Sequence, residues 1–304
     1  MASTSTNQRV SRLYDDEPAF IYGTAWKKDR TKELVKEALK QGFRRVDTAA
    51  QPRHYQEGLV GEALREAFTE GVLKRDELYL QTKYTTPAGQ DLSNMPYDPK
   101  APLETQVRSS VASSLKNLRH EAESEGTAYI DCLLLHSPLP TIEQTLQAWK
   151  LLESYVPGQI RALGISNVTL PVLQAIYEHA AVKPAVVQNR FHHQTRYDVA
   201  LRAFCIERNI TYQSFWTLTG NPTLLKSGPV TALAQAANVD FPVALYALVM
   251  DLGVVVLNGS TSRHHLRTDL EGIQSVREWA KSHAEDFASI NEGFGSLVGQ
   301  DNTT

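Results

Sequence analysis

Short runs of apolar and β-branched residues alternate along the chain with longer amphipathic stretches. The short runs predict eight strands: Phe20–Tyr22, Arg44–Asp47, Leu78–Thr82, Tyr129–Leu135, Ile160–Ile165, Ala185–Gln188, Ile210–Phe215 and Val254–Leu257. Several are apolar at almost every position, as in Gly253–Leu257. This pattern is typical of strands that are buried on both faces of a parallel sheet.

The amphipathic stretches have the spacing of helices and carry helix-end signals. They predict seven helices: Thr31–Gln41, Leu59–Glu70, Leu103–Leu118, Thr141–Tyr155, Leu170–His179, Arg196–Arg208 and Phe241–Leu252. Gly42 is placed to cap the first of them, and Thr141 with Gln144 forms a capping-box pattern. Strands alternating with helices over about 240 residues favour a single-domain α/β fold, the (β/α)8 TIM barrel. A doubly wound open sheet is the alternative, although no Gly-x-Gly-x-x-Gly follows the first strand.

Three segments lie outside this alternation. We expect residues 1–17, rich in Ser and Thr and then charged, to be a flexible N-terminal segment before a barrel of residues 18–290. Residues 291–304, rich in Gly and polar residues, are expected to form a C-terminal tail that is either a substrate flap or frayed. The long polar segment Tyr84–Lys100 follows the third strand, so in a barrel it would overhang the catalytic face.

Composition narrows the choice of partners. The 304 residues carry a formal net charge of −3, and no basic block is present, so we expect neither a nucleic-acid nor a membrane partner. The N-terminus lacks the apolar core of a signal peptide, and the apolar stretch Leu245–Leu257 is too short to span a bilayer. Two widely separated thiols, Cys132 and Cys205, indicate a reducing compartment. We therefore expect a cytoplasmic protein.

Four titratable residues lie at or just after the ends of predicted strands two, three and four: Asp47, Tyr55, Lys83 and His136. In a barrel these strand ends share one face. An ammonium beside a phenol lowers the pKa of the phenol from about 10 toward neutrality, and an aspartate keeps the ammonium charged and oriented. A histidine can hold a carbonyl oxygen through a hydrogen bond. Such a set can protonate an oxygen on which negative charge develops, as hydride delivery to a carbonyl requires. His192-His193 has no carboxylate or Cys at metal-ligand spacing, so we expect no metal site.

From roughly Phe20 to Leu270, the sequence resembles the aldo-keto reductase superfamily. The matching segments, in order, are Gly23-Thr24-Ala25-Trp26, Arg45-Val46-Asp47-Thr48-Ala49, His54-Tyr55 with Gly61, Leu80-Gln81-Thr82-Lys83, Leu133-Leu134-Leu135-His136-Ser137-Pro138, Gly164-Ile165-Ser166-Asn167, Gln188-Asn189 and Gly253-Val254-Val255-Val256. Each segment alone is weak, but their order along the chain is specific. The resemblance implies a (β/α)8 barrel that binds an extended NADP(H), with the four residues above as its Asp/Tyr/Lys/His tetrad.

The resemblance also implies a set of binding residues. Ser166, Asn167 and Gln188 match the residues that hold the nicotinamide carboxamide, and Phe215 takes the place of a Tyr that stacks under the nicotinamide. Thr24 is expected at the nicotinamide end. The residues expected near the substrate are Trp26, Tyr55, His136 and Trp216.

The sequence departs from the family pattern at three places. Asp47 and Tyr55 are eight residues apart, wider than usual, so Gln51-Pro52-Arg53 is expected to bulge from the loop. The usual Ser-Pro-Leu-Gly after strand seven reads Trp216-Thr217-Leu218-Thr219, which leaves Trp216 and Leu218 as cofactor contacts. The usual Pro-Lys-Ser that grips the 2′-phosphate reads Asn258-Gly259-Ser260, and the Arg that stacks on adenine becomes His265, or His264 in a register shifted by one.

Gly259 in place of a lysine removes a cation worth about 1.5–3 kcal/mol of binding. Compensation is expected from Ser260, Thr261, Arg263 or Arg267 at the start of the next helix. NADPH therefore remains the expected cofactor, with NADH as the alternative and weaker discrimination between the two.

The sequence thus predicts a monomeric NADP(H)-dependent enzyme that reduces a small-molecule aldehyde or ketone to an alcohol, with Tyr55 as the proton donor. Two other functions remain open on the same barrel. One is a cofactor-binding regulatory subunit, and the other is a redox-neutral isomerase, dehydratase or cyclase.

Overall fold

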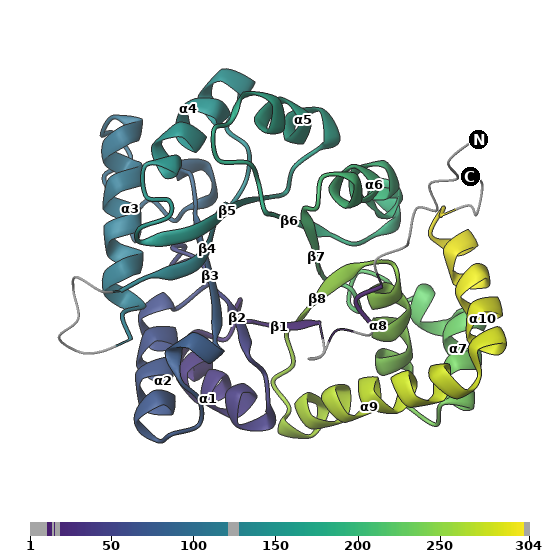
Figure 1. Cartoon of the computed structure of the whole chain (residues 1–304). Helices are drawn as coiled ribbons and strands as arrows, with labels where there is room; N and C mark the ends of the chain where they lie inside the picture. Colours follow the sequence, from purple (N-terminus) through teal and green to yellow (C-terminus); the bar gives the residue numbers. More distant parts are fainter. Residues whose placement is uncertain (1–10, 14, 16–18, 121–127, 301–304) are drawn as a thin grey trace.

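The computed structural model describes residues 11–13, 15, 19–120 and 128–300. Eight parallel strands form a closed barrel in chain order, as predicted, and the helices surround it (Figure 1). The strands are β1 (Phe20–Gly23), β2 (Arg45–Asp47), β3 (Tyr79–Tyr84), β4 (Ile130–Leu135), β5 (Ile160–Ser166), β6 (Val186–Arg190), β7 (Thr211–Phe215) and β8 (Val254–Asn258). The barrel closes where Phe20 of β1 pairs with Val256 of β8.

The seven predicted helices are present with small shifts at their ends. They are α1 (Thr31–Gln41), α2 (Glu57–Thr69), α3 (Leu103–Asn117), α4 (Ile142–Glu153), α5 (Leu170–His179), α6 (Val199–Glu207) and α8 (Phe241–Asp251). Gly42 caps α1 with a left-handed φ of 113°, which glycine adopts without steric cost. The Thr141 hydroxyl caps α4 by accepting a hydrogen bond from the Gln144 backbone N–H. These local signals therefore act in the fold as the sequence indicates.

Three helices were not predicted: α7 (Gly228–Ala236), α9 (Arg263–Ser282) and α10 (Ala284–Leu297). The prediction of a tail from residue 291 is wrong for residues 291–297, which complete α10. The glycines in this region serve packing, because a Cβ on Gly293 would lie 3.3 Å from Pro229 Cγ of α7. Phe294 on the same helix is fully buried. Residues 301–304 lie outside the described residues.

Part of the predicted flexible N-terminal segment is packed against the barrel. Leu13 is fully buried, and its carbonyl accepts a hydrogen bond from Arg277 Nε of α9. Ser11 Oγ donates to Asp251 Oδ1 at the end of α8 (2.8 Å). Ser11 and Leu13 are therefore held in place, whereas residues 1–10, 14 and 16–18 are not described.

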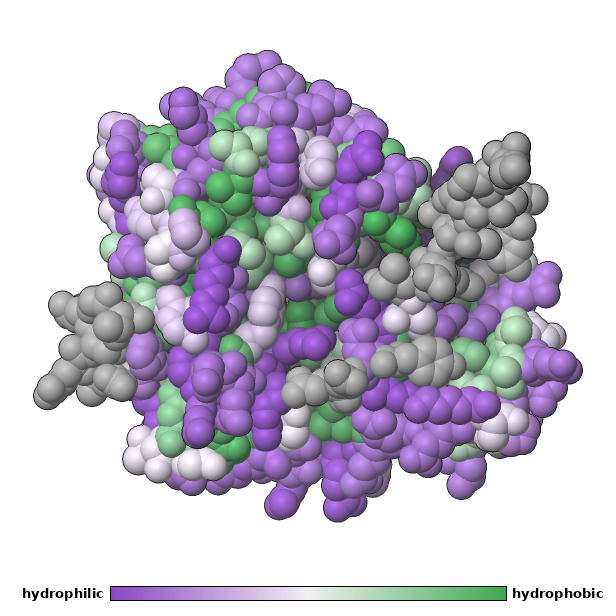
Figure 2. Space-filling view, viewed as in Figure 1, coloured by the Kyte–Doolittle hydropathy of each residue, from purple (hydrophilic) through white to green (hydrophobic). Residues whose placement is uncertain are grey.

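The helices present polar side chains outward. Figure 2 shows that the surface seen in the direction of Figure 1 is mostly hydrophilic, with apolar residues in small areas between the helices. Within the described residues, no single helix is long and apolar enough to cross a membrane. The pair α7 and α8 reaches that length only together and is bent by 108°, and α8 is buried at most positions.

Helix α2 must lie very close to the end of α3, because Gly61 approaches the backbone there. A Cβ at Gly61 would lie 1.8 Å from the Asn117 carbonyl oxygen, whereas a Cβ at Gly58, one turn earlier, would meet nothing within 4 Å. This contact matters for the site because α2 begins two residues after Tyr55.

Gly61→Ala is therefore expected to destabilise the fold by about 2–3 kcal/mol, since backbone has to move to admit the methyl group. Gly58→Ala is the matched control in the same helix, and we expect it to stabilise by about 0.5–1 kcal/mol through helix propensity. Urea denaturation of both variants measures the difference. Equal stability of the two variants would contradict the close approach.

Candidate active site

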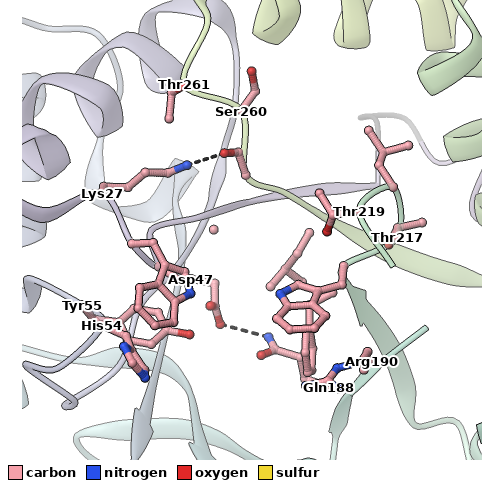
Figure 3. Close-up of a pocket in the computed structure, with 18 of the residues that line it drawn as sticks. Lys27, Asp47, His54, Tyr55, Gln188, Arg190, Thr217, Thr219, Ser260 and Thr261 are labelled. Carbon is pink, nitrogen blue, oxygen red and sulfur yellow. Dashed lines mark hydrogen bonds between the residues drawn. The ribbon is translucent and has the colours of Figure 1, made fainter. Parts of the chain in front are cut away.

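A cavity of about 940 Å³ opens over the carboxyl ends of the strands (Figure 3). Its walls contain most of the residues that the sequence singles out. These are Trp26, Asp47, Tyr55, His136, Ser166, Asn167, Gln188, Phe215, Trp216, Leu218, Gly259, Ser260, Thr261 and His265. Lys83 lies beneath the cavity floor and is 1% exposed. The strand ends therefore converge as the barrel geometry requires.

A buried ion pair forms the floor of the site. Lys83 Nζ on β3 donates to both oxygens of Asp47 on β2 (2.8 and 2.6 Å) and to the carbonyl oxygen of Thr48 (2.8 Å). Burial by itself lowers the pKa of Lys83, but the adjacent Asp47 carboxylate outweighs it and the pKa is raised overall. The ammonium therefore stays charged although water cannot reach it.

Three glutamines complete the floor. Gln81 Nε2 and Gln188 Nε2 both donate to Asp47 Oδ1 (2.7 and 3.0 Å) and to Gln213 Oε1 (2.9 Å each). Gln213 in turn donates to Gln81 Oε1. With its N–H groups used in this way, Gln188 keeps an amide oxygen that accepts no hydrogen bond from any described residue. That oxygen is available to a ligand above the floor.

Tyr55 reaches the ion pair despite its wide spacing from Asp47. Its ring lies 4.9 Å from Lys83 Nζ, and its centroid lies 6.1 Å from that of the His136 ring. The inserted residues form a turn, in which the backbone N–H groups of His54 and Tyr55 donate to the Gln51 carbonyl (3.0 and 2.9 Å). Gln51 Nε2 is tied to the Gly89 carbonyl of the overhanging loop. The turn therefore accommodates the inserted residues, and Tyr55 still lies beside Lys83.

The ionisation of Tyr55 differs from the expectation. Burial raises its pKa above the ordinary value, and the Lys83 charge only partly offsets this. The pKa is therefore not lowered toward neutrality, because removing water from the phenolate outweighs the attraction of an ammonium that Asp47 already neutralises. Tyr55 holds its proton at neutral pH.

His136, directly after β4, is neutral and oriented. Burial, with a smaller contribution from the Lys83 charge, lowers its pKa to about 3. Its Nδ1 lies 2.6 Å from Thr85 Oγ1. The Thr85 hydroxyl is buried and has no other hydrogen-bond partner among the described residues, so we assign it as the donor to Nδ1. The ring proton is then on Nε2.

Thr85 was missed by the sequence analysis. The only signal was its position two residues after Lys83, on the same side of an extended chain.

The side walls are aromatic. The Trp26 ring lies against the His54 ring in a tilted arrangement, with their centroids 3.8 Å apart, and is 61% exposed. Trp216 beyond β7 is 49% exposed. Figure 3 shows Tyr55 and His54 near Asp47 on one side of the cavity and Arg190 near Gln188 on the other.

Ser166 Oγ donates to the Gln188 carbonyl (2.7 Å), and Asn167 Nδ2 donates to the His136 carbonyl (3.0 Å). The residues predicted to hold a carboxamide are thus neighbours.

Three residues predicted to contact the cofactor do not line the cavity. Thr24 is buried and its hydroxyl donates to the Asp47 carbonyl (2.9 Å), so it supports the floor instead. Asn258 is buried and donates to Asp269 Oδ2 (2.7 Å), which ties the end of β8 to α9. His264 is exposed outside the cavity, whereas His265 lies in its wall.

At the β8 end of the cavity, a lysine stands where sequence analysis did not expect one. Lys27 is 8% exposed, and its Nζ donates to the Gly259 carbonyl oxygen (Figure 3). Arg263 and Arg267, the expected substitutes for the missing cation, pair instead with Glu37 (3.0 Å) and Glu271 (3.9 Å). Burial, with a smaller contribution from Arg30, lowers the pKa of Lys27 to about 8.

No group of three or more His, Cys, Asp or Glu side chains that could hold a metal ion occurs within residues 11–13, 15, 19–120 and 128–300.

Comparisons with known proteins agree with this geometry. The sequence profile of the aldo/keto reductase family matches residues 19–290. The chain is 27% identical over 304 aligned residues to a D-galacturonate reductase of Hypocrea jecorina, covering 90% of this chain and 89% of that protein. It is 25% identical to a glycerol 2-dehydrogenase (NADP(+)) of the same fungus, covering 92% and 94%.

Solved structures show the same fold. The aldose reductase of Schistosoma japonicum superposes with a TM-score of 0.68 at 22% identity, covering 87% of this chain and 88% of that one. An aldo-keto reductase of the silkworm Bombyx mori, in complex with NADPH, has a TM-score of 0.67 at 18% identity, covering 88% and 86%.

The profile match spans most of the barrel, and the strand-end residues that it covers converge on one cavity. The chain is therefore a member of the aldo/keto reductase family.

Proposed function

We propose that this protein is an NADP(H)-dependent oxidoreductase that reduces an aldehyde or ketone to an alcohol, with Tyr55 as the proton donor. The observation that carries the proposal is the placement of a protonated phenol over the Lys83–Asp47 ion pair, beside a neutral His136, in one wall of a large cavity. The names of the two Hypocrea jecorina relatives, a reductase and an NADP(+)-dependent dehydrogenase, support the reaction class.

The residues of the cavity fit a nicotinamide dinucleotide. At one end, the hydroxyl of Ser166 and the amides of Asn167 and Gln188 provide the donors and acceptors that a carboxamide needs. Phe215 in the same cavity provides a face for stacking. At the other end, Lys27 brings a cation beside Ser260 and Thr261, a set suited to phosphate oxygens.

When bound, a reduced nicotinamide would supply a hydride to the substrate carbonyl carbon. Tyr55 donates its proton to the carbonyl oxygen as negative charge develops there. Lys83 then stabilises the phenolate, and Asp47 holds Lys83 in position. His136 donates a hydrogen bond from Nε2 to the same oxygen, because Thr85 occupies Nδ1. The Trp26 and Trp216 rings on the cavity walls suit an apolar or aromatic body on the substrate.

Tyr55→Phe keeps the ring and removes the proton donor. We expect the rate of carbonyl reduction to fall by at least about 10³-fold, within the range of general-acid catalysis, while NADPH binding stays nearly unchanged. Steady-state kinetics following NADPH absorbance and fluorescence titration of NADPH measure the two effects. A variant that retains most of its turnover with a good substrate would rule out Tyr55 as the acid.

Thr85→Val removes the hydroxyl and keeps the shape of the side chain. Because the Nε2–H tautomer of His136 then loses its support, we expect kcat/KM to fall by about tenfold, which corresponds to one hydrogen bond. Nitrogen NMR of labelled imidazole should show a neutral Nε2–H tautomer in the unmodified protein and a mixture in the variant. Thr86→Val, in the next residue, is the control. An unchanged tautomer in Thr85→Val would contradict the assignment.

We further propose that Lys27 replaces the cation missing at Gly259, so that NADPH is the preferred cofactor. A Cβ built on Gly259 would lie 3.9 Å from Lys27 Nζ, so the ammonium occupies the space into which a longer side chain at 259 would extend. A glycine at 259 and a buried lysine at 27 are therefore complementary. The ammonium is held by one carbonyl oxygen, and the described residues provide it with no carboxylate partner.

Lys27→Met should raise the Kd for NADPH by about 10–100-fold, equivalent to about 1.5–3 kcal/mol, and leave the Kd for NADH nearly unchanged. Adding Gly259→Lys should restore NADPH binding, and Lys28→Met is the control. Because Lys27 is charged only below its pKa of about 8, NADPH affinity should fall as the pH rises through 8 in the unmodified protein but not in Lys27→Met. An equal loss of NADPH and NADH would place the contact at the diphosphate, and no loss would exclude Lys27.

A further inference from the structure

Arg190 is a second cation in the cavity, and neither the reaction nor the cofactor contacts proposed above use it. It ends β6, two residues after Gln188, so both side chains leave the same side of the strand. Gln188 is part of the floor, which places Arg190 one layer higher, toward the mouth (Figure 3). Its backbone is rigid, because Arg190 pairs with Phe215 in the barrel register.

The guanidinium is held by aromatic faces. Its Cζ lies 4.1 Å from the centre of the Trp216 ring and 5.8 Å from that of Phe215. Trp216 adopts a φ of 58°, in the left-handed region that favours glycine, and its ring lies under the arginine. Contact with aromatic faces orients the planar guanidinium and leaves its N–H groups available for hydrogen bonds.

The donors of Arg190 are left uncommitted. Its Nε is buried and has no hydrogen-bond partner among the described residues. The described residues also provide Arg190 with no ion pair, in contrast to Arg75, which pairs with Asp131 at 2.8 Å. The nearest acid in sequence, Asp198, is occupied by Asn189 Nδ2 (2.7 Å) and the Tyr212 hydroxyl (3.0 Å).

The positive charge is not neutralised by the protein. The neighbouring His192 has a lowered pKa, first because of burial and then because of the Arg190 charge. A half-buried guanidinium with unused donors, in the wall of a ligand cavity, favours an anionic ligand. Two parallel N–H groups match the two oxygens of a carboxylate or a phosphate.

We propose that Arg190, stacked on Trp216, is an anion-binding arm of the active-site cavity that takes the carboxylate or phosphate oxygens of a bound ligand. This inference rests on the proposed function. In the cavity, two groups carry anionic oxygens of this kind: an acidic group on the carbonyl substrate and the diphosphate of the cofactor.

The test uses the full-length protein and two aromatic aldehydes, 4-formylbenzoate and its methyl ester, which differ by the negative charge and one methyl group. Arg190→Met removes the charge and keeps the aliphatic stem, and Arg190→Lys keeps the charge and removes the fork. The matched control is Arg208→Met, since Arg208 also stacks on aromatic rings, Phe204 at 5.4 Å and Tyr177 at 5.7 Å, but lies outside the cavity. Kinetics with each aldehyde, calorimetric binding of each aldehyde, and fluorescence titration of NADPH and NADH are compared.

If Arg190 binds an acidic group of the substrate, Arg190→Met lowers kcat/KM for 4-formylbenzoate at least tenfold. The kcat/KM for the ester and the Kd values for both cofactors are then unchanged, and Arg190→Lys has an intermediate kcat/KM for 4-formylbenzoate. If Arg190 binds the diphosphate of the cofactor, the Kd values of Arg190→Met for NADPH and NADH rise equally, by at least tenfold. The ratio of the kcat/KM values for the two aldehydes is then unchanged. Changes below threefold in every measurement overturn the inference.

The two proposals can fail separately. If the unmodified protein reduces the ester and Arg190→Met does so equally well, with no change for 4-formylbenzoate or the cofactors, the reductase function stands and the anion site is wrong. If the unmodified protein reduces neither aldehyde, the calorimetric and fluorescence titrations still decide on Arg190.

Discussion

The site depends on the Lys83–Asp47 ion pair, which lies inside the barrel where water cannot solvate either charge. A buried pair is stable only when its geometry is good and its remaining lone pairs are satisfied. Here the ammonium contacts three oxygens, and Gln81 and Gln188 donate to one oxygen of the carboxylate. Removing either partner would leave an uncompensated charge in the core. The glutamine cluster is thus part of the same structural requirement.

Burial of this ion pair also affects the protonation of Tyr55 and His136, which lie above it. Burial raises the pKa of Tyr55 by more than the Lys83 ammonium lowers it, so the phenol stays protonated. The same burial keeps His136 neutral, so it can donate a hydrogen bond without adding a charge. The site therefore holds one mobile proton on Tyr55 and a fixed donor on His136. This arrangement suits the protonation of an oxygen better than its deprotonation.

Away from the floor, the cavity carries two cations that have no carboxylate partner among the described residues. Lys27 at the β8 end contacts a carbonyl oxygen, and Arg190 near β6 contacts two aromatic faces. Both lie in a chain of net charge −3, so the positive charge is local to the cavity. An anionic ligand with several acidic groups would meet a cation at two places in this cavity.

The sequence alone is enough to predict the barrel, because alternating strand and helix periodicities are local properties of neighbouring residues. It also placed Asp47, Lys83, His136 and Gln188 at strand ends, where the symmetry of a barrel brings them together. Helix α9 was missed although its buried residues Leu266, Ile273 and Ala280 recur every seven positions, which is helical spacing. Helix α10 was missed because its glycines and polar residues were interpreted as a tail.

Which residues meet across the cavity follows from the three-dimensional fold and could not be predicted from the sequence pattern. Lys27 contacts the Gly259 carbonyl oxygen because β1 and β8 are neighbours in the closed barrel, although more than two hundred residues separate Lys27 from Gly259 along the chain. Thr85 reaches His136 through the adjacency of β3 and β4, and Arg190 reaches Trp216 through that of β6 and β7. The protonation of Tyr55 likewise follows from burial. Contacts and burial arise from the closing of the barrel, and that step is not encoded in any one segment.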